Sequence, residues 1–272
     1  MPVLTLTSDF GSKDPDLAVL KAQIMQAFPD FRIVDISHDI TPFDLEEAFY
    51  ILKNSLFRFP KGTIHLLALD TETYSKNRPV LIQDEHYTYV GNDNGILPAL
   101  LEGQEYQAYY LDAVPYDSFM QVHLEALGHI QEQAFPTLMT SPAENLKKMK
   151  LPEPELGYDG NKVRYIRPKV IYIDHYGNAV FNLKKKDFEQ WRNGRKTLVN
   201  TLHFPIKYIS KGYNDLKTTS LGGRRGEFGA RFNHFGFFEI FVNGSNHKTG
   251  GANRLLGFSK NDLVHIVFED EI

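Results

Sequence analysis

The chain has no cysteine among its 272 residues. Disulfides, thiol nucleophiles and thiolate metal sites are therefore excluded, and the composition fits a reducing compartment. Long apolar runs are missing as well, since no stretch approaches the roughly 18 apolar residues that a transmembrane helix needs. The first residues, MPVLTLTSDFGSKD, lack the basic region and apolar stretch of a signal peptide. We therefore expect a cytoplasmic protein with no membrane partner.

An excess of positive charge is also missing. The formal net charge is −4 and the isoelectric point is about 6.2, so no basic field attracts nucleic acid. The one basic run, Lys184-Lys185-Lys186, is interpreted as a solvated face rather than a nucleic-acid patch. The composition is that of an ordinary globular protein, with 42% hydrophobic and 24% charged residues. Its length suffices for two hydrophobic cores.

Apolar periodicity predicts strands that alternate with helices in the first half of the chain. The predicted strands are 3–7, 31–36, 63–69, 79–83 and 87–90, and the predicted helices are 16–28, 45–57, 97–101 and about 118–134. Asp44 is placed to cap the second of these helices. This alternation favours an α/β fold with a parallel or mixed sheet covered on both faces.

The pattern changes after residue 140. Proline, lysine and glycine mark 141–162 as a connector between an α/β domain, residues 1–140, and a second domain, residues 163–272. The second domain is mostly short strands separated by Gly/Asn turns, which is consistent with a small all-β barrel or sandwich. Its predicted strands are 170–173, 197–200, 239–242 and 263–268.

Polar residues follow four of the predicted strands. They are Asp9, His38-Asp39, Asp70 and the run Asn92-Asp93-Asn94. Any one of them could simply be a cap or turn former. Because ligands bind at the carboxyl ends of strands in open α/β sheets, the coincidence of four favours a site for a small polar ligand. An ionised Asp there accepts hydrogen bonds from ribose hydroxyls or an ammonium group.

Other kinds of site have weaker support. Asp9, His38 and Asp70 could ligate a metal, but no HExxH motif is present. A nucleophilic serine lacks its GxSxG motif. Phe43, just after a strand and a proline, could stack on a heterocycle or pack as a hydrophobic staple.

Five stretches carry a resemblance to a known family. They are LTLTSDFG at 4–11, VDISH with TPFD at 34–44, GNDNG at 91–95, IDHYGN at 173–178, and FNHFG with EIFVNG at 232–244. In consistent order along the chain, they resemble the S-adenosylmethionine (SAM) hydroxide adenosyltransferases. These proteins are also called adenosine-forming SAM hydrolases and are related to fluorinase and chlorinase.

The resemblance implies a Rossmann-like N-terminal domain and a β-barrel-like C-terminal domain. It also implies a homotrimer whose sites lie between one subunit's N-terminal domain and its neighbour's C-terminal domain. The implied reaction displaces methionine from the ribose C5′ of SAM with water or hydroxide, giving adenosine. In-line placement and a dry pocket serve such chemistry, so the resemblance implies no cofactor and no metal.

The resemblance also implies roles for particular residues. Asp9 would hold the ribose hydroxyls, Phe43 would cover the adenine, and Asp14 would bind the methionine ammonium. Asn243 and Gly244 would offer backbone groups to the adenine. The full implied substrate-binding set is Asp9, Asp14, Phe43, Asn94, Phe119, Asp174, Tyr176, Asn178, Asn243 and Gly244.

The catalytic positions depart from the family pattern. The catalytic Asp falls on Asp70, but the catalytic Arg falls on Asn77, with Arg78 one place later. The catalytic His falls on Met120, and His123 is about one helical turn away. The catalytic set implied is therefore Asp70, Arg78 and His123, with slow turnover. The alternatives are a non-catalytic SAM- or adenosine-binding protein and, third, a metal-dependent hydrolase.

Overall fold

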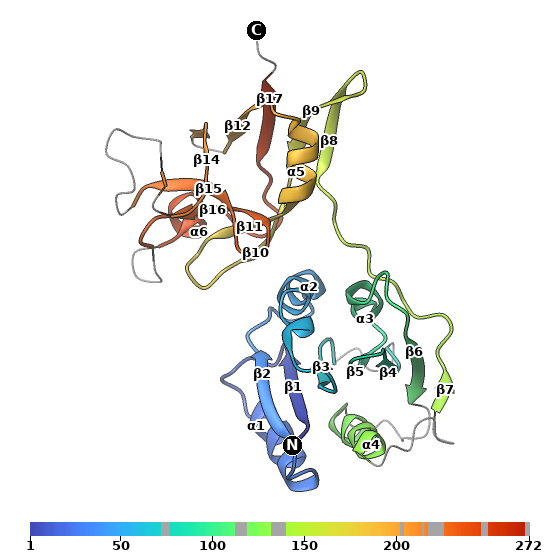
Figure 1. Ribbon diagram of the computed structural model, residues 1–272. Helices are drawn as coiled ribbons and strands as arrows, with labels where there is room; N and C mark the ends of the chain where they lie inside the picture. Colours follow the sequence, from blue (N-terminus) through green and yellow to red (C-terminus); the bar gives the residue numbers. More distant parts are fainter. Residues whose placement is uncertain are drawn as a thin grey trace. The chain divides into compact units, whose positions relative to one another are not determined.

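The computed structural model describes residues 1–71, 77–111, 119–131, 140–201, 204–213, 215–216, 226–245 and 250–269, with backbone only at 119, 120, 131 and 140. The chain splits into two compact units, Met1–Leu151 and Pro152–Ile272 (Figure 1). The predicted connector 141–162 is thus shared between the units, and it contains regular structure. Residues 141 and 142 end one strand in the first unit, and Glu155–Asp159 forms another in the second.

The first unit is built on one seven-stranded mixed sheet with the order β2-β1-β3-β5-β4-β6-β7. Its first four members are mutually parallel and the others pair antiparallel. The predicted α/β fold with a mixed sheet is confirmed. The strands are β1 (Val3–Ser8), β2 (Arg32–Ser37), β3 (Ile64–Ala68), β4 (Pro79–Gln83), β5 (Thr88–Asn92), β6 (Gln107–Leu111) and β7 (Thr140–Pro142).

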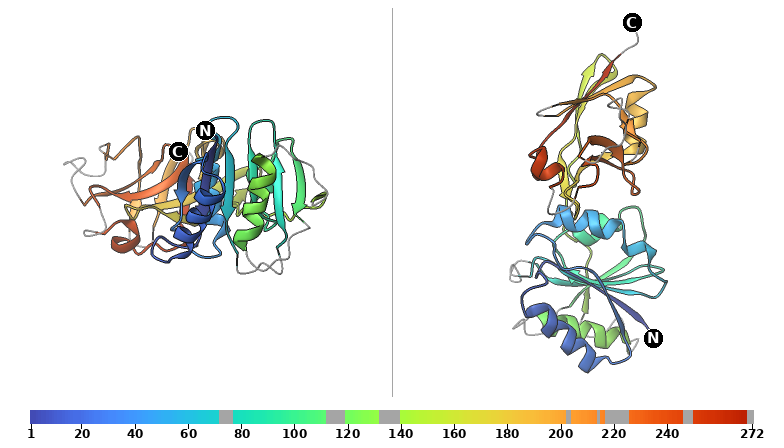
Figure 2. Two further views of the ribbon diagram at one scale, coloured as in Figure 1. Left: turned by 90° about the horizontal axis from the view of Figure 1, so that it is seen from below. Right: turned by 90° about the vertical axis from the view of Figure 1, so that its left-hand side faces the viewer.

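Helices cover both faces of this sheet (Figure 2, right). The core on one face contains residues of α1 (Asp16–Ala27) and α4 (Phe119–Gln131). The core on the other face contains residues of α2 (Leu45–Lys53) and α3 (Ile96–Leu100). Strand β3 serves both cores because its side chains alternate: Leu66 belongs to the α1/α4 core and Leu67 to the α2/α3 core.

The second predicted helix begins as the sequence indicates and ends earlier. The Asp44 side chain accepts the Glu47 amide at 2.9 Å, which confirms the predicted cap. The helix α2 ends at Lys53 and is followed by the short 3₁₀ helix η1 (Leu56–Arg58). At the break, the side chains of Asn54 and Ser55 bond to the carbonyls of the preceding turn, which competes with continuation of the helix.

The second unit contains two five-stranded sheets, ordered β10-β11-β16-β15-β14 and β13-β12-β17-β9-β8. Both contribute to one hydrophobic core. Within the described residues the pairing does not close into a barrel, so the barrel-like prediction is not confirmed. The strands are β8 (Glu155–Asp159), β9 (Lys162–Arg167), β10 (Val170–Ile173), β11 (Ala179–Lys184), β12 (Lys196–Asn200), β13 (Pro205–Ile206), β14 (Ile209–Ser210), β15 (Phe228–Phe232), β16 (Phe237–Val242) and β17 (His265–Glu269).

The prediction of an all-β second domain is wrong. Besides its strands, the second unit contains the helices α5 (Lys185–Arg192) and α6 (Ala252–Leu255). The basic run at 184–186 leads into α5, which is amphipathic: Phe188 is fully buried against the rings of Phe232 and Phe268. Phe188 and the partly buried Trp191 are the apolar residues of this short helix that pack on the core, too few among its charges to give a clear periodicity.

None of the helices in the described part of the chain combines the length and the apolar character needed to cross a membrane.

A buried histidine lies inside the first unit. His65 is fully buried in β3, with its Nδ1 2.7 Å from the Thr5 hydroxyl on β1 and its ring stacked on Tyr89 at 5.3 Å between centroids. Burial, which penalises the charged imidazolium, lowers the pKa of His65 from 6.5 to about 4. The native protein therefore keeps this ring neutral over a range where the unfolded chain protonates it.

This difference predicts a loss of stability in acid. As the pH falls below about 6.5, the unfolded chain gains a proton at His65 that the folded protein does not, so stability decreases until the pH reaches about 4. At pH 5 this difference at His65 lowers the free energy of unfolding by about 2 kcal/mol relative to neutral pH. Urea unfolding at pH 7.5 and pH 5 measures it. The Thr5→Val/His65→Phe variant removes both polar partners and should lose less stability between these pH values; an equal loss would contradict the assignment.

Candidate functional site

The polar residues predicted from the strand ends lie along one edge of the sheet in the first unit. In the parallel register, Thr7 of β1 is opposite both Ser37 of β2 and Leu67 of β3. The residues that follow these strands, Asp9, His38 and Asp70, therefore leave the sheet at the same level. Strand β5 pairs with β3 and brings Asn92 and its successors to this edge. The parallel pairing thus gathers all four groups where ligands bind in open α/β sheets.

The Asp9 carboxylate binds two loops at once. Its Oδ2 accepts the backbone amides of Phe43 at 3.1 Å and of Asp70 at 3.2 Å. Both donors have left-handed backbone conformations, with φ of 65° and 54°. Such conformations cost on the order of 1–3 kcal/mol outside glycine and persist where the surroundings impose them. Asp9 therefore fixes the backbone of two predicted site residues, while its Oδ1 accepts no hydrogen bond from the described residues.

The Asp70 side chain is held by a residue of the predicted catalytic region. Its Oδ2 accepts the Asn77 amide group at 2.8 Å, and Asn77 is only 6% exposed. The Asn77 oxygen in turn accepts the Lys147 ammonium at 2.7 Å. Arg78 stacks its exposed guanidinium on the Tyr110 ring at 3.6 Å. Of the two candidates for the family's arginine position, Asn77 is the one for which the structure describes a contact with Asp70.

Side chains of the Asn92-Asp93-Asn94 run form hydrogen bonds to neighbouring segments at this edge. Asn94 donates to the Leu69 carbonyl at 3.4 Å and accepts the Ile96 amide at 3.2 Å, so both ends of its side-chain amide contact the protein. Asp93 is buried, and its carboxylate accepts the Lys147 amide at 2.9 Å and the Tyr110 hydroxyl at 3.0 Å. The interpretation as turn formers and caps fits the Asn94 bond to the Ile96 amide, whereas the other contacts join segments that are distant in the sequence.

The other residues predicted in the first unit are spread over different environments. Phe43 is 51% exposed, which leaves its ring available for stacking and rules out a core role. Asp14 is exposed in the turn before α1. His123 is fully buried in α4, a helix that packs on α1, β4 and β5. Phe119 and Met120 begin the same helix, and their side chains lie outside the described residues.

Nothing in the described part of the chain favours a metal centre. No group of three or more His, Asp or Glu side chains there is arranged to hold an ion. His38, one of the three candidate ligands, has Nδ1 2.7 Å from the Ser8 hydroxyl and Nε2 3.1 Å from Asp35 Oδ1. Both ring nitrogens thus face protein partners.

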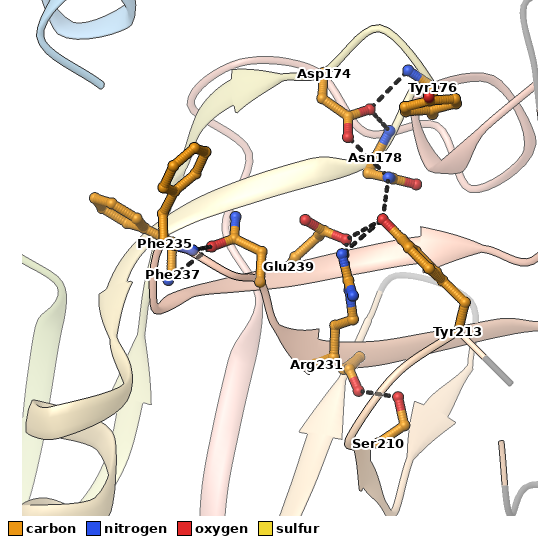
Figure 3. Close-up of polar contacts among 11 residues, drawn as sticks. Asp174, Tyr176, Asn178, Ser210, Tyr213, Arg231, Phe235, Phe237 and Glu239 are labelled. Carbon is orange, nitrogen blue, oxygen red and sulfur yellow. Dashed lines mark hydrogen bonds and ion pairs between the residues drawn. The ribbon is translucent and has the colours of Figure 1, made fainter. Parts of the chain in front are cut away.

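The second unit gathers its predicted residues around the turn 174–178 (Figure 3). Asp174 accepts the amides of Tyr176 and Asn178, both at 2.8 Å, and the Asn178 side chain at 2.8 Å. Gly177 has φ of 80° and approaches Gly251 so closely that a Cβ would lie 3.0 Å from its Cα. The Ser245 hydroxyl binds the Tyr176 carbonyl at 3.1 Å, which brings the turn at Asn243-Gly244 to the same place.

Sequence reasoning missed a charged network beside this turn (Figure 3). Glu239, 2% exposed, accepts Arg231 Nε at 3.0 Å and the Tyr213 hydroxyl at 3.2 Å. Burial raises the pKa of Glu239, and burial with the nearby Glu239 charge raises the pKa of Tyr213 to about 12. Asn178 donates to the same hydroxyl at 3.3 Å. The available signal was the acid inside the apolar run FFEIFV of β16.

Removing the Asp9 carboxylate tests its role as a clamp. We expect Asp9→Ala to lower the free energy of unfolding by about 1–3 kcal/mol, because two amides lose a charged acceptor. The amides of Phe43 and Asp70 should exchange their hydrogens faster. Asp14→Ala removes an exposed carboxylate from the same region and is the control, with a change within about 0.5 kcal/mol. Equal effects of the two substitutions, measured by urea unfolding and hydrogen exchange, would show that Asp9 is not a clamp.

The fold and this edge define a class: an α/β protein with polar side chains gathered at the carboxyl ends of parallel strands, where small ligands bind in such sheets. Sequence comparison identifies the family. The SAM hydroxide adenosyltransferase N-terminal domain matches residues 4–126, and the C-terminal domain of the same family matches residues 168–265. The chain belongs to the SAM hydroxide adenosyltransferase family, and the resemblance found in the sequence is confirmed.

The matches to individual relatives have low sequence identity but extend over most of the chain. The chain is 25% identical over 200 residues to an (R)-S-adenosyl-L-methionine hydrolase of Methanocaldococcus jannaschii, covering 69% of each protein. It is 25% identical over 245 residues to a fluorinase of Nocardia brasiliensis, covering 75% of this chain and 80% of that one. The crystal structure of an uncharacterized conserved protein from Thermotoga maritima has the same fold, with a TM-score of 0.73, 20% identity, and coverage of 98% and 100%.

Proposed function

We propose that this protein hydrolyses SAM to adenosine and methionine. The observation that carries the proposal is the clamp at the sheet edge, where Asp9 holds the backbone of Asp70 and of Phe43 through one oxygen. The clamp fixes the backbone of a residue with a carboxylate and of a residue with an exposed aromatic ring, the two kinds of side chain that family resemblance assigns to catalysis and adenine binding. Kinship with proteins named (R)-S-adenosyl-L-methionine hydrolase supports the same reaction.

The proposed chemistry is a displacement at the ribose C5′. Water attacks C5′, the C5′–S bond breaks, and its electron pair stays on the methionine sulfur. The water proton passes to Asp70, which orients the nucleophile in line with the leaving sulfur. The sulfonium is already a good leaving group, so we propose that no metal or cofactor takes part. Family resemblance proposes Arg78 and His123 as further catalytic residues.

The proposed binding roles follow the same reasoning. Asp9 Oδ1 takes ribose hydroxyls, Phe43 covers the adenine and Asp14 binds the methionine ammonium. Asn94 and Phe119 are proposed to contribute to the same site. The second unit's cluster is proposed to supply the remaining contacts, from Asp174, Tyr176, Asn178, Asn243 and Gly244.

One observation favours a second candidate, a SAM- or adenosine-binding protein that does not turn its ligand over. At the position where family resemblance expects an arginine, the Asp70 carboxylate accepts the neutral amide of Asn77. An amide stabilises an oriented carboxylate less than a guanidinium does. Binding without product release would identify this candidate.

Incubation with SAM and chromatography of the products distinguishes these functions. We expect adenosine and methionine in equal amounts, with a rate about 100-fold or more lower in Asp70→Asn, because the substitution removes the group that accepts the proton. EDTA should leave the rate unchanged, and inhibition by EDTA would favour the metal-dependent alternative.

Calorimetry with SAM should show tight binding that Asp9→Ala weakens roughly 10- to 150-fold. Binding with no adenosine would refute hydrolysis and leave the binding protein.

We also propose that the protein is a cytoplasmic homotrimer with adenosyl sites at its subunit interfaces. Family resemblance is the support, and closed symmetry is the usual form of soluble oligomers. Light scattering coupled to size exclusion should give three times the mass of the 31.2 kDa chain at micromolar concentration. A monomer that binds SAM with full affinity would refute both the trimer and the shared site.

A further inference from the structure

The backbone of segment 143–149 is bound to β6 at one end and to the loop at the site edge at the other. The Ala143 amide donates to the Ala108 carbonyl at 2.9 Å, the Lys147 amide to Asp93 at 2.9 Å, and the Met149 amide to the Gly95 carbonyl at 3.3 Å. Gly95 has φ of 95°, and a Cβ there would lie 2.6 Å from the Met149 nitrogen. Only glycine allows this approach. The segment's position is therefore fixed without any help from the Lys147 side chain.

That side chain reaches Asp70 through one bridging amide. Lys147 Nζ donates to Asn77 Oδ1 at 2.7 Å, and Asn77 Nδ2 donates to Asp70 Oδ2 at 2.8 Å. An ammonium only donates and an ionised carboxylate only accepts, so the buried amide fits between them in one orientation. Its oxygen must face Lys147 and its NH₂ must face Asp70.

The charge on Lys147 matters for this arrangement. A cation on the amide oxygen polarises the amide, which strengthens the hydrogen bond that its NH₂ donates to the carboxylate. Asp70 is then fixed at two points: its backbone amide by Asp9 and its side chain by Asn77. Without the ammonium, the Asn77 oxygen loses a charged donor, and the NH₂ that faces Asp70 is less polarised and binds the carboxylate more weakly.

We propose that Lys147 is a positioning residue of the hydrolytic site, acting through Asn77 to orient the Asp70 carboxylate and to provide positive charge near it. The inference rests on the proposed function, because it assigns Lys147 to the site in which Asp70 orients the water. A purely structural role would be the tethering of segment 143–149, which the backbone bonds already accomplish.

Steady-state kinetics with SAM provides the first test. We expect Lys147→Met, which keeps the aliphatic stem and removes the charge, to lower kcat about 10- to 100-fold with KM changed less than about threefold. Lys147→Arg should retain most of the activity. Lys148→Met is the matched control, since Lys148 is, like Lys147, an exposed lysine of the same segment, and it should match the wild type. Unchanged kcat in Lys147→Met, or an equal loss in Lys148→Met, would overturn the proposal.

A double variant sharpens this test. Asn77→Arg/Lys147→Met places a cation directly beside Asp70 and makes the lysine unnecessary. We expect it to recover kcat relative to Lys147→Met alone. If Lys147→Met were inactive merely because the segment had lost its place, the added arginine would not restore turnover, and the positioning role would be refuted. Thermal melting of each variant shows whether it is folded.

A measurement that does not depend on turnover separates this inference from the proposed function. The side-chain NH₂ of Asn77 gives ¹⁵N resonances that can be assigned by their loss in Asn77→Ala. They should shift and exchange faster in Lys147→Met, and stay unchanged in Lys148→Met. If the wild type releases no adenosine but these resonances respond, hydrolysis is refuted and the Lys147–Asn77–Asp70 connection stands. If they do not respond, the connection is refuted whatever the turnover.

Discussion

One carboxylate oxygen holds the candidate site of the first unit in place. Asp9 Oδ2 accepts the amides of Phe43 and Asp70, which come from loops after β2 and β3. Both residues have positive φ, which an L side chain disfavours, and the charged acceptor offsets that cost. Asp9 can do this because it leaves β1, the strand between β2 and β3, and so reaches both loops. The exposed ring of Phe43 and the carboxylate of Asp70 depend on it for their positions.

The second unit organises its candidate residues around a buried ion pair. Glu239 and Arg231 lie directly opposite each other on β16 and β15, and Tyr213 bonds to both. Burial alone would favour the neutral acid, and the arginine opposes that shift. Breaking such a pair from one side typically costs about 3–5 kcal/mol, because a buried charge is left without its partner. Through Tyr213 the pair also sets the position of Asn178, and through it the turn at Asp174.

Part of the stretch 141–162, which is rich in proline and lysine, contributes to the candidate site of the first unit. From composition, residues 141–162 look like a connector, and part of them does pass from one unit to the other. Segment 143–149, however, is bound by its backbone amides to β6 and to the loop at Asp93 and Gly95, and it carries Lys147 to Asn77. Lysine is common on surfaces, so nothing in its sequence context distinguishes Lys147 from Lys148 or Lys150. Its significance comes from the distance to one buried amide.

Local sequence patterns were enough to predict the alternation of strands and helices in the first unit, the Asp44 cap, the polar residues at four strand ends and the family. These follow from local periodicity, turn chemistry and short motifs, all of which are written in neighbouring residues. Those patterns did not predict α5, the open sheets of the second unit, or the partners of its charged groups. Asn77 and Lys147 are 70 residues apart, and Arg231 meets Glu239 only through strand register. Such contacts depend on how distant segments pack, because a side chain's partner is chosen by tertiary proximity, and only the folded structure decides it.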